Sequence, residues 1–439
     1  MMNEWNPLLP PEHRLTETAW TSIEAITHAI IRNDYPKSTS TRVVRPYEAP
    51  LLYGYLAAVH NDDTWGARAV TALNEAISSI GMYRANIGLF GGVCGLGWTL
   101  EHIGALLIAM EGAEGAEEDS GSSGTEDSGM ELNAYVLDLI VGGPPRANYD
   151  LVSGLVGAGV YFIERLPHET AILGVKAVVN QLEVLSRPVG KGLAWHTAPE
   201  LLPDWQRKRC PSGYYNLGVA HGIPGIIQFL TSAAVLGIAT TQCAGLVEGA
   251  VDWLIAQEPP QDSYARFTAW VAPEQTSGSR LTWCYGDLGI LAVLSQVVAV
   301  FPREKWNTFV RELLDRCVNW PPELSGVADA PLCHGAAGTA HIFNRLFQTS
   351  GDARCKDRAI FWLEECLLMR TPGQGVGGYS ARTMPDPQGP VVWDPTPAFL
   401  DGAIGVALML LSAVSPCEPG WDRLMALSRK PLTVNLQMT

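Results

Sequence analysis

The chain has 439 residues, of which 47% are hydrophobic and 17% are charged, a balance typical of a soluble globular protein with a large core. A formal net charge of −15 argues against nucleic-acid binding, which needs a basic face. Nine cysteines without a regular spacing argue against a secreted disulfide framework and favour a reducing cytoplasm.

The N-terminal segment Met1–Arg14 lacks the charged and then apolar pattern of a secretory signal. The longest apolar stretches, residues 223–239 and 288–301, are interrupted by polar residues and are short for a membrane span. We therefore expect a cytoplasmic protein with no transmembrane segment. Its apolar helices should be buried among other helices.

A Gly-x-x-Gly pair followed by an apolar helical run recurs along the chain. Such a repeat indicates copies of one supersecondary unit, each contributing one apolar helix. The run at residues 50–59 resembles a degenerate first copy. The first glycines of the six clear copies are Gly92, Gly154, Gly222, Gly286, Gly335 and Gly402.

Between the copies lie helical segments with one polar face, such as residues 169–185 and 305–318. A unit of one apolar and one amphipathic helix cannot bury its apolar helix alone, so the units must pack side by side. Closing the row predicts an all-α fold, an alpha/alpha toroid of about seven inner and seven outer helices. We expect it to form a single domain over residues 1–439. The glycines should permit close approach of the backbones and turns with positive φ.

Three segments fall outside the repeat. The acidic Gly/Ser/Glu tract at residues 111–129 has almost no apolar side chains, which predicts a disordered loop. Residues 186–215 and 257–282 are Pro-rich insertions with strand-like runs at 192–197 and 265–271, and they predict a small β-rich extension.

Two thiols and an imidazole lie just before two of the glycine pairs: Cys284 is two residues before one pair, and Cys333 and His334 immediately precede the next. This is a ligand set that zinc prefers, and three protein ligands would leave a fourth position open, as in catalytic zinc sites. The alternative is a pair of ordinary buried thiols. The repeat favours zinc, because the same turn of neighbouring units would deliver all three donors to one end of the toroid.

The same turn carries two further candidates, since His221 directly precedes Gly222 and Asp150 lies four residues before Gly154. Asp150 could instead cap a helix, and His221 could be a core histidine or a fourth zinc ligand that closes the site. A purely structural ring does not require titratable side chains in several copies of one turn. We therefore interpret both residues as candidates for catalysis.

Arg280 and Tyr285, close to Cys284 in the sequence, could steady an anion or donate a proton, and packing at the rim explains them equally well. Cys94, His102 and His341 lie on or at the start of apolar helices, which predicts core positions. The other cysteines have no partner at ligand spacing: Cys210, Cys243, Cys317, Cys355, Cys366 and Cys417.

From about Leu51 to Leu411 the chain resembles the LanC-type lanthipeptide cyclases. The resemblance rests on the repeated glycine pairs and on the strings NLGVAHGIPG, WCYGDLG, CHGAAG and FLDGAIGVALML. It implies an alpha/alpha toroid with a zinc ion at one end. By matching strings it implies zinc on Cys284, Cys333 and His334, catalytic roles for His221 and Asp150, and supporting roles for Arg280 and Tyr285.

The resemblance also implies a reaction. Zinc would hold a cysteine of a peptide substrate as its thiolate, which would add to a dehydroalanine or dehydrobutyrine of the same peptide. His221 would protonate the α-carbon and Asp150 would orient His221. The product would be a lanthionine or methyllanthionine thioether ring.

The expected substrate is a dehydrated lanthipeptide precursor, with a leader and a core peptide. A free-standing cyclase would receive it from a separate dehydratase, and we expect a transient, membrane-bound complex that includes an exporter. One hypothesis is that the β-rich extension or the basic run Arg207-Lys208-Arg209 binds the leader.

The sequence is also consistent with two alternative functions. A LanC-like enzyme could add glutathione to dehydrated residues. A zinc-stabilised module could bind peptides without catalysing any reaction.

Overall fold

Buried apolar helices alternate with amphipathic helices along the chain, as the repeat predicts. The computed structural model describes residues 5–37, 47–79, 86–111, 123–143, 148–260, 263–273, 279–384 and 389–431. Within these residues the all-α prediction is confirmed. The apolar helices are α2 (Ala49–His60), α4 (Val93–Glu111), α6 (Leu155–Glu164), α9 (Ile223–Val235), α11 (Asp287–Val300), α13 (Ala336–Ser350) and α15 (Ala403–Val414).

The helices between them present one polar face. In the described part of the chain seven apolar and seven amphipathic helices are present, the number expected from the repeat, together with the short α8 (Asp204–Arg209). The amphipathic helices are α1 (Thr16–Arg32), α3 (Asp63–Ser78), α5 (Ser123–Val141), α7 (Glu169–Leu185), α10 (Thr240–Ile255), α12 (Glu304–Val318) and α14 (Ala353–Leu368).

The chain divides into two compact units, each assembled from separate segments. Unit 1 comprises Met1–Ala76, Arg280–Ala292 and Leu314–Gly420. Unit 2 comprises Ile77–Ser279, Val293–Leu313 and Trp421–Thr439. The expectation of a single domain over residues 1–439 stays a prediction.

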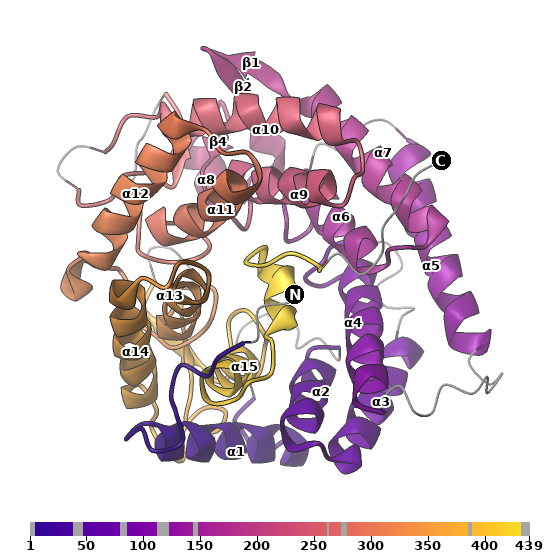
Figure 1. Ribbon diagram of the computed structural model, residues 1–439, viewed down its shortest axis with the longest axis vertical. Coiled ribbons are helices and arrows are strands. Elements are labelled where there is room, and N and C mark those ends of the chain that lie inside the picture. Colours follow the sequence, from indigo (N-terminus) through magenta and orange to yellow (C-terminus); the bar gives the residue numbers. More distant parts are fainter. Residues whose placement is uncertain are drawn as a thin grey trace. The chain divides into compact units, whose positions relative to one another are not determined.

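Within each unit an apolar helix packs against an amphipathic neighbour. In unit 1, α13 packs against α14, and α15 contacts α1, α2 and α13 (Figure 1). In unit 2, α9 lies along α10, and α6 contacts α4, α7 and α9 (Figure 1). The pairing buries the apolar helices, which cannot be stable in water alone.

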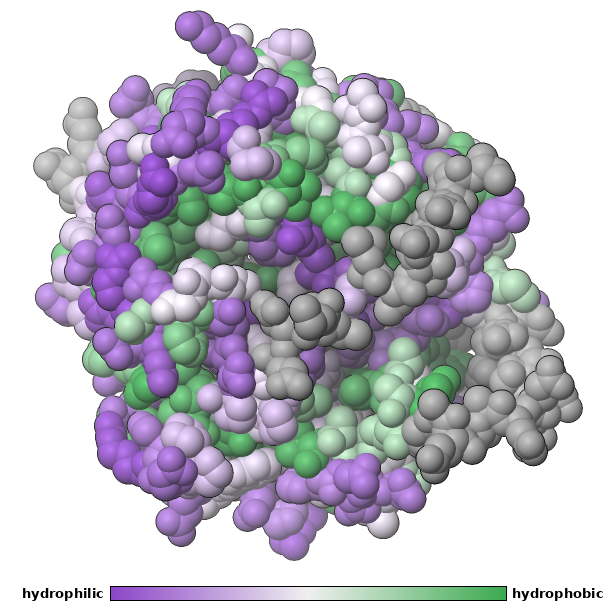
Figure 2. All heavy atoms as spheres, viewed as in Figure 1, coloured by the Kyte–Doolittle hydropathy of each residue, from purple (hydrophilic) through white to green (hydrophobic). Residues whose placement is uncertain are grey.

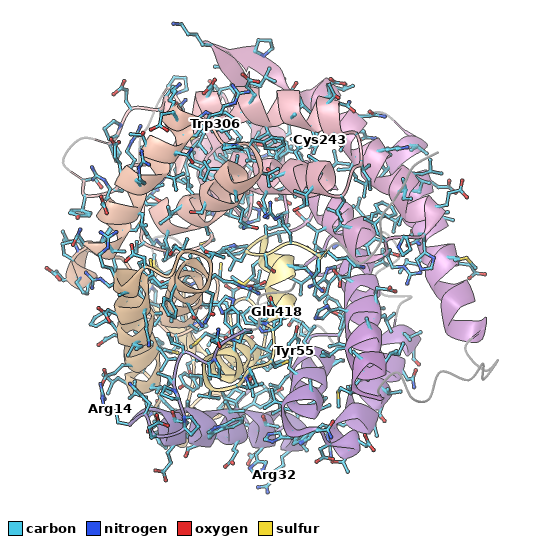
Figure 3. All side chains as sticks on the ribbon, in the orientation of Figure 1. Arg14, Arg32, Tyr55, Cys243, Trp306 and Glu418 are labelled. Carbon is cyan, nitrogen blue, oxygen red and sulfur yellow. The ribbon has the colours of Figure 1, made fainter. Side chains whose placement is uncertain are left out.

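The surface of unit 2 shows the same separation of apolar and polar side chains. Hydrophobic side chains gather over α9, whereas hydrophilic ones prevail along α12 (Figure 2). Trp306 of α12 donates from Nε1 to Asp252 Oδ1 of α10 at 3.0 Å (Figure 3). Cys243 of α10 is fully buried (Figure 3).

Where the structure describes the chain, three small antiparallel sheets interrupt the helices. The predicted insertions hold β1 (Arg187–Val189), β2 (Gly192–Ala194), β3 (His196–Thr197), β4 (Tyr214–Asn216) and β5 (Trp270–Val271). β1 pairs with β2, and the second sheet has the order β3-β4-β5. Of the strand-like run at 265–271, only the last two residues form a strand. A third sheet pairs β6 (Ala381–Thr383) with β7 (Val392–Asp394).

Short 3₁₀ helices occur at Pro199–Leu201, Pro322–Leu324 and Gly420–Met425. Of the acidic tract 111–129, predicted to be disordered, residues 112–122 lie outside the described residues. Helix α5 begins at Ser123, so the end of the tract is helical, unlike the expectation.

One helix among the described residues, α4, is long and apolar enough to cross a bilayer by length and composition. Half of its 18-residue window Val93–Met110 is buried inside the protein. The core helix of a soluble protein passes the same test, so the prediction of no transmembrane segment stays a prediction.

Each apolar helix from α4 to α15 follows a seven-residue segment that we call the glycine turn: the first glycine of a pair and the six residues before it. The carbonyl of the first residue of the turn reaches over the helix start and accepts the N–H that follows the glycine. Asn148 O accepts from Leu155 at 3.1 Å, and Asp329 O accepts from Ala336 at 2.8 Å.

The glycines are needed for space and not for conformational freedom. Gly154, Gly222, Gly335 and Gly402 have φ values of −116°, −135°, −106° and −148°, so the expectation of positive φ is wrong for these positions. A Cβ on Gly154 would lie 2.6 Å from Asn148 O. In every glycine turn the Cβ would meet the carbonyl of the first residue of the turn.

We predict that Gly154→Ala destabilises the protein by about 1–3 kcal/mol, because backbone atoms must shift to admit the methyl group. Gly245→Ala on α10 is the matched control, since nothing lies within 4 Å of its added Cβ. Alanine there should stabilise the helix by about 0.5–1 kcal/mol. Urea unfolding of both variants measures this, and equal effects would contradict the steric explanation.

Candidate functional site

Backbone hydrogen bonds join neighbouring glycine turns. In unit 1, Cys284 N–H donates to Cys333 O at 3.2 Å, and Cys333 N–H donates to Leu400 O at 2.9 Å. In unit 2, Leu151 N–H donates to Ala220 O at 3.2 Å. These bonds fix the register of one turn against the next, so side chains at equivalent turn positions come together.

The three predicted metal ligands are one such group. Cys284 and Cys333 each lie two residues before the glycine of their turns, and His334 directly follows Cys333. Their donor atoms all lie within 4.8 Å of one another. Two donors of a tetrahedral zinc site with bonds of 2.0–2.3 Å are separated by about 3.5–3.8 Å. The residues therefore fit a single zinc ion after small side-chain movements.

The cluster stabilises a thiolate on Cys284, the form that binds metal, and holds a proton on His334 that a metal ion would displace. Hydrogen bonding with Cys333 lowers the pKa of Cys284 well below its usual value, with help from His334 and Arg280, although burial opposes the shift. Burial alone would lower the pKa of His334, but hydrogen bonds with Asp329 and Cys284 outweigh it and raise that pKa to about 10. A thiolate is the form of cysteine that binds metal.

Arg280 and Tyr285 belong to the same glycine turn as Cys284. Arg280 is exposed, and its charge helps to lower the pKa of Cys284. Its aliphatic part packs over Gly326, where an added Cβ would lie 3.0 Å from Arg280 Cγ. Tyr285 is half-buried, and its carbonyl accepts from Thr282 Oγ1 at 3.0 Å.

Two acidic residues that sequence reasoning missed flank His334. Asp329 Oδ2 lies 3.5 Å from its Nε2, and Asp401 Oδ1 lies 3.9 Å from its Nδ1. Asp401 directly precedes Gly402, the turn position that His221 and His334 occupy in their copies. Aligning the copies position by position would have singled it out. Asp329 is the first residue of its turn, where the other copies carry Asn, Arg or Thr.

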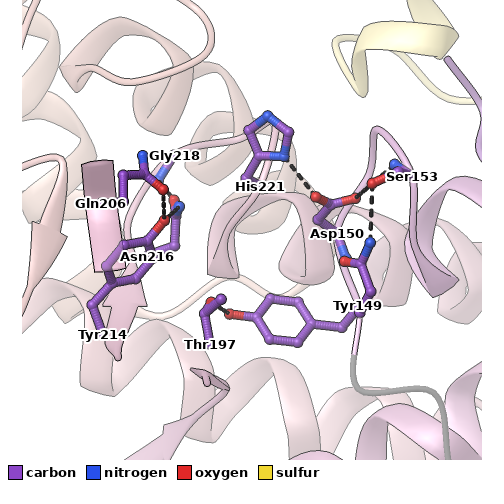
Figure 4. Close-up of polar contacts among 10 residues, drawn as sticks. Tyr149, Asp150, Ser153, Thr197, Gln206, Tyr214, Asn216, Gly218 and His221 are labelled. Atoms are coloured by element: carbon purple, nitrogen blue, oxygen red, sulfur yellow. Dashed lines mark hydrogen bonds and ion pairs between the residues drawn. The ribbon is translucent and has the colours of Figure 1, made fainter. Parts of the chain in front are cut away.

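The two predicted catalytic residues meet in unit 2. His221 Nδ1 lies 2.6 Å from Asp150 Oδ2 (Figure 4). The side chain of His221 is 42% exposed, which argues against a core histidine, and that of Asp150 is 12% exposed. Asp150 Oδ1 also accepts from Ser153 N at 2.7 Å, in the manner of a cap. One oxygen thus holds the turn and the other holds the histidine.

The β-rich insertion supports this pair. Tyr149, beside Asp150, donates from Oη to Trp195 O at 3.1 Å and shares a 2.6 Å hydrogen bond with Thr197 Oγ1 of β3 (Figure 4). Burial raises the pKa of Tyr149, so it stays a neutral hydrogen-bonding group. The insertion therefore fixes the backbone from which Asp150 projects.

A second set of contacts steadies the turn that carries His221. Asn216, at the end of β4, accepts from Gly218 N–H at 2.8 Å. Tyr214 Oη donates to Gln206 Oε1 of α8 at 3.0 Å (Figure 4). Helix α8 and strand β4 are thereby tied to the start of the His221 turn.

The residues expected in the core are there. Cys94, His102 and His341 are 0%, 6% and 1% exposed, and His102 Nδ1 lies 3.1 Å from Glu164 Oε1. Burial raises the pKa of Cys243 and Cys355 to about 12, so both are inert thiols near neutral pH. These cysteines do not belong to the metal cluster found among the described residues.

Comparison with known proteins places these features in context. A family model described as lanthionine synthetase C-like protein matches residues 50–426. Glutathione S-transferase LANCL1 of Danio rerio is 23% identical over 330 residues, which cover 72% of each protein. The solved structure of a nisin cyclase aligns with a TM-score of 0.68 at 15% identity, covering 94% of this chain and 98% of that one. This likeness confirms the predicted alpha/alpha toroid fold.

Proposed function

Because the chain belongs to the lanthionine synthetase C-like family, we propose that it is a zinc-dependent peptide cyclase. The reaction would be the intramolecular addition of cysteine thiols to dehydroalanine or dehydrobutyrine in a dehydrated peptide, which forms lanthionine or methyllanthionine rings. The observation that carries the proposal is the cluster of Cys284, Cys333 and His334, whose donor atoms lie within 4.8 Å of one another.

The donor set supports zinc with an open position. Cys284 and Cys333 would bind through Sγ and His334 through one ring nitrogen, and a tetrahedral ion then has one place for a substrate. A zinc ion in that site would hold the substrate thiol as its thiolate, whereas a free thiol with a pKa of about 8.5 is only a few per cent ionised near neutrality.

To complete the addition, a proton must be delivered to the α-carbon of the dehydrated residue. The S–Cβ bond forms as the Cα=Cβ π bond breaks, and its electrons pass to an enolate. His221 would deliver a proton to Cα, since an unperturbed imidazole pKa of about 6.5 suits this task. Asp150 would hold Nδ1 of His221 and balance its charge. The thiol loses one proton and the α-carbon gains one, so the product is an isomer of the substrate.

Arg280 and Tyr285 are proposed as supporting residues. Arg280 carries an exposed positive charge whose field reaches Cys284, which suits stabilisation of a thiolate or an enolate oxygen. Tyr285, next to Cys284, could contribute a hydroxyl group to the same task.

The proposed reaction defines the partners. The substrate would be a dehydrated precursor with leader and core peptides, and an enzyme that dehydrates serine and threonine must act first. We propose a cytoplasmic enzyme that meets a separate dehydratase, and an exporter, in a transient complex.

The similarity to a glutathione S-transferase of the family favours one second candidate. The same cluster could hold the thiol of glutathione and add it to a dehydrated residue. The product would then gain the mass of glutathione, whereas ring closure leaves the peptide mass unchanged and removes thiols that can be alkylated.

We predict that the purified wild type contains about one zinc ion per chain and that Cys284→Ala loses both the metal and the activity, since a catalytic zinc site with an open position needs all three protein donors. Elemental analysis and mass spectrometry of a dehydrated peptide measure this. Cys243→Ala is the control, because Cys243 is a buried thiol outside the cluster. A wild type that binds zinc but leaves peptide thiols alkylatable at the uncatalysed rate would instead indicate a peptide-binding module.

We predict that His221→Ala lowers kcat by about 10²–10⁴-fold, the usual contribution of a general acid, and leaves the zinc content unchanged. Asp150→Asn should cause a smaller loss, since the imidazole remains but is held less firmly. His28→Ala, an exposed histidine on α1, is the control. Loss of zinc from His221→Ala would contradict the proposed role and favour a metal ligand.

The leader peptide is predicted to dock on α8. Its basic residues Arg207, Lys208 and Arg209 are exposed beside Trp205 and Leu201, which are 38% and 42% exposed. Arg209 stacks over Trp205 at 5.6 Å. This mixed basic and apolar surface suits an acidic peptide with apolar side chains.

Replacing Arg207, Lys208 and Arg209 by Ala should weaken leader binding by about tenfold. The matched control replaces Arg303, Lys305 and Arg311, which are exposed cations paired with acids of unit 2. Fluorescence titration with a labelled leader measures both. Equal affinities of the two variants would remove α8 as the docking surface.

A further inference from the structure

We propose that Asp329 is the positioning residue of the metal centre: it holds the imidazole of His334 so that one ring nitrogen is presented to the metal beside the two thiols. This inference rests on the proposed zinc site. It goes beyond the three donor residues, because it assigns a role to a buried carboxylate outside the donor cluster.

The geometry of Asp329 suits this role. Its Oδ2 lies 3.5 Å from Nε2 of His334, and the residue is 1% exposed. The same oxygen accepts the backbone N–H of Arg382, on β6, at 2.9 Å. A main-chain donor from a paired strand thus prevents the carboxylate from rotating away from the histidine.

The second carboxylate, that of Asp401, lies farther from the imidazole and is more exposed. Its Oδ1 lies 3.9 Å from Nδ1, beyond hydrogen-bond length, and its side chain is 26% exposed. Among the described residues neither carboxylate belongs to the group of donor atoms that lie within 4.8 Å of one another. Both therefore act on the imidazole from outside the ligand set, and Asp329 is the nearer and the more buried of the two.

The chemistry of imidazole explains why such a residue is needed. A neutral histidine has one N–H and one lone pair, and the hydrogen bond made by the first decides which nitrogen binds the metal. A proton on Nε2, which lies 3.5 Å from Asp329 Oδ2, would leave the lone pair on Nδ1 for the metal. The carboxylate also makes the imidazole nitrogen a stronger electron-pair donor to the metal. Loss of such a partner typically lowers metal affinity about 10–100-fold.

The test measures metal binding and does not depend on turnover. Zinc affinity is determined by competition with a chromophoric chelator, and the absorption spectrum of the Co²⁺-substituted protein reports the ligand geometry. We expect Asp329→Ala to bind zinc about 10–100-fold more weakly, with an altered Co²⁺ spectrum. Asp329→Asn keeps a hydrogen-bond acceptor and should recover most of the affinity. Asp401→Asn should remain close to the wild type.

Glu48→Ala controls for damage to the fold, because Glu48 is also a buried carboxylate that accepts a backbone N–H, that of Phe399 at 3.2 Å. It should lower thermal stability without changing zinc affinity. Wild-type affinity in Asp329→Ala, or an equal loss of affinity in Glu48→Ala, would overturn the inference. A wild type that binds no metal would instead overturn the proposed function, so the two failures are distinguishable.

Discussion

The site depends on one steric constraint, repeated along the chain: a backbone carbonyl lies over the start of each apolar helix where a Cβ would otherwise be. Glycine at this position lets Asn148 O or Asp329 O reach the N–H after it. The helix start and the turn before it are thereby fixed as one piece. Hydrogen bonds between neighbouring turns, such as that from Cys284 to Cys333, then bring side chains from distant parts of the sequence into contact.

Chemistry is added to this frame by changing side chains at a few turn positions. In unit 1 the turns supply two thiols and an imidazole, and two carboxylates lie around the imidazole. In unit 2 they supply a histidine held by an aspartate. The bonds from carbonyl to N–H at the helix starts involve main-chain atoms alone, although Asp150 also accepts the N–H of Ser153 within its turn. The same backbone arrangement of the glycine turn can therefore carry a metal centre in unit 1 and an acid–base pair in unit 2.

The glycine pairs and the polarity of the intervening segments were sufficient to predict the all-α class and the alternation of helices. They also singled out Cys284, Cys333 and His334, because turn positions are visible in the sequence. The backbone conformation of the glycines was not predictable in this way. A glycine in the sequence does not show whether it is needed for a positive φ or for the close approach of another backbone atom. Asp401 was missed although it occupies a turn position that is visible in the sequence. Asp329 lies in the same turn as His334, and it was missed because its contact with the imidazole depends on how that turn folds. Sequence reasoning likewise overextended the strand that β5 forms, whose length is set by pairing with β4.

X-ray absorption spectroscopy at the zinc edge of the purified protein tests the central claim most directly. The account predicts two sulfur ligands at about 2.3 Å and two lighter ligands at about 2.0–2.1 Å, one from His334 and one not supplied by the protein. Addition of a thiol-containing peptide should replace the latter with a third sulfur. A closed shell of four protein ligands that does not change with the thiol, or the absence of bound metal, would contradict the account.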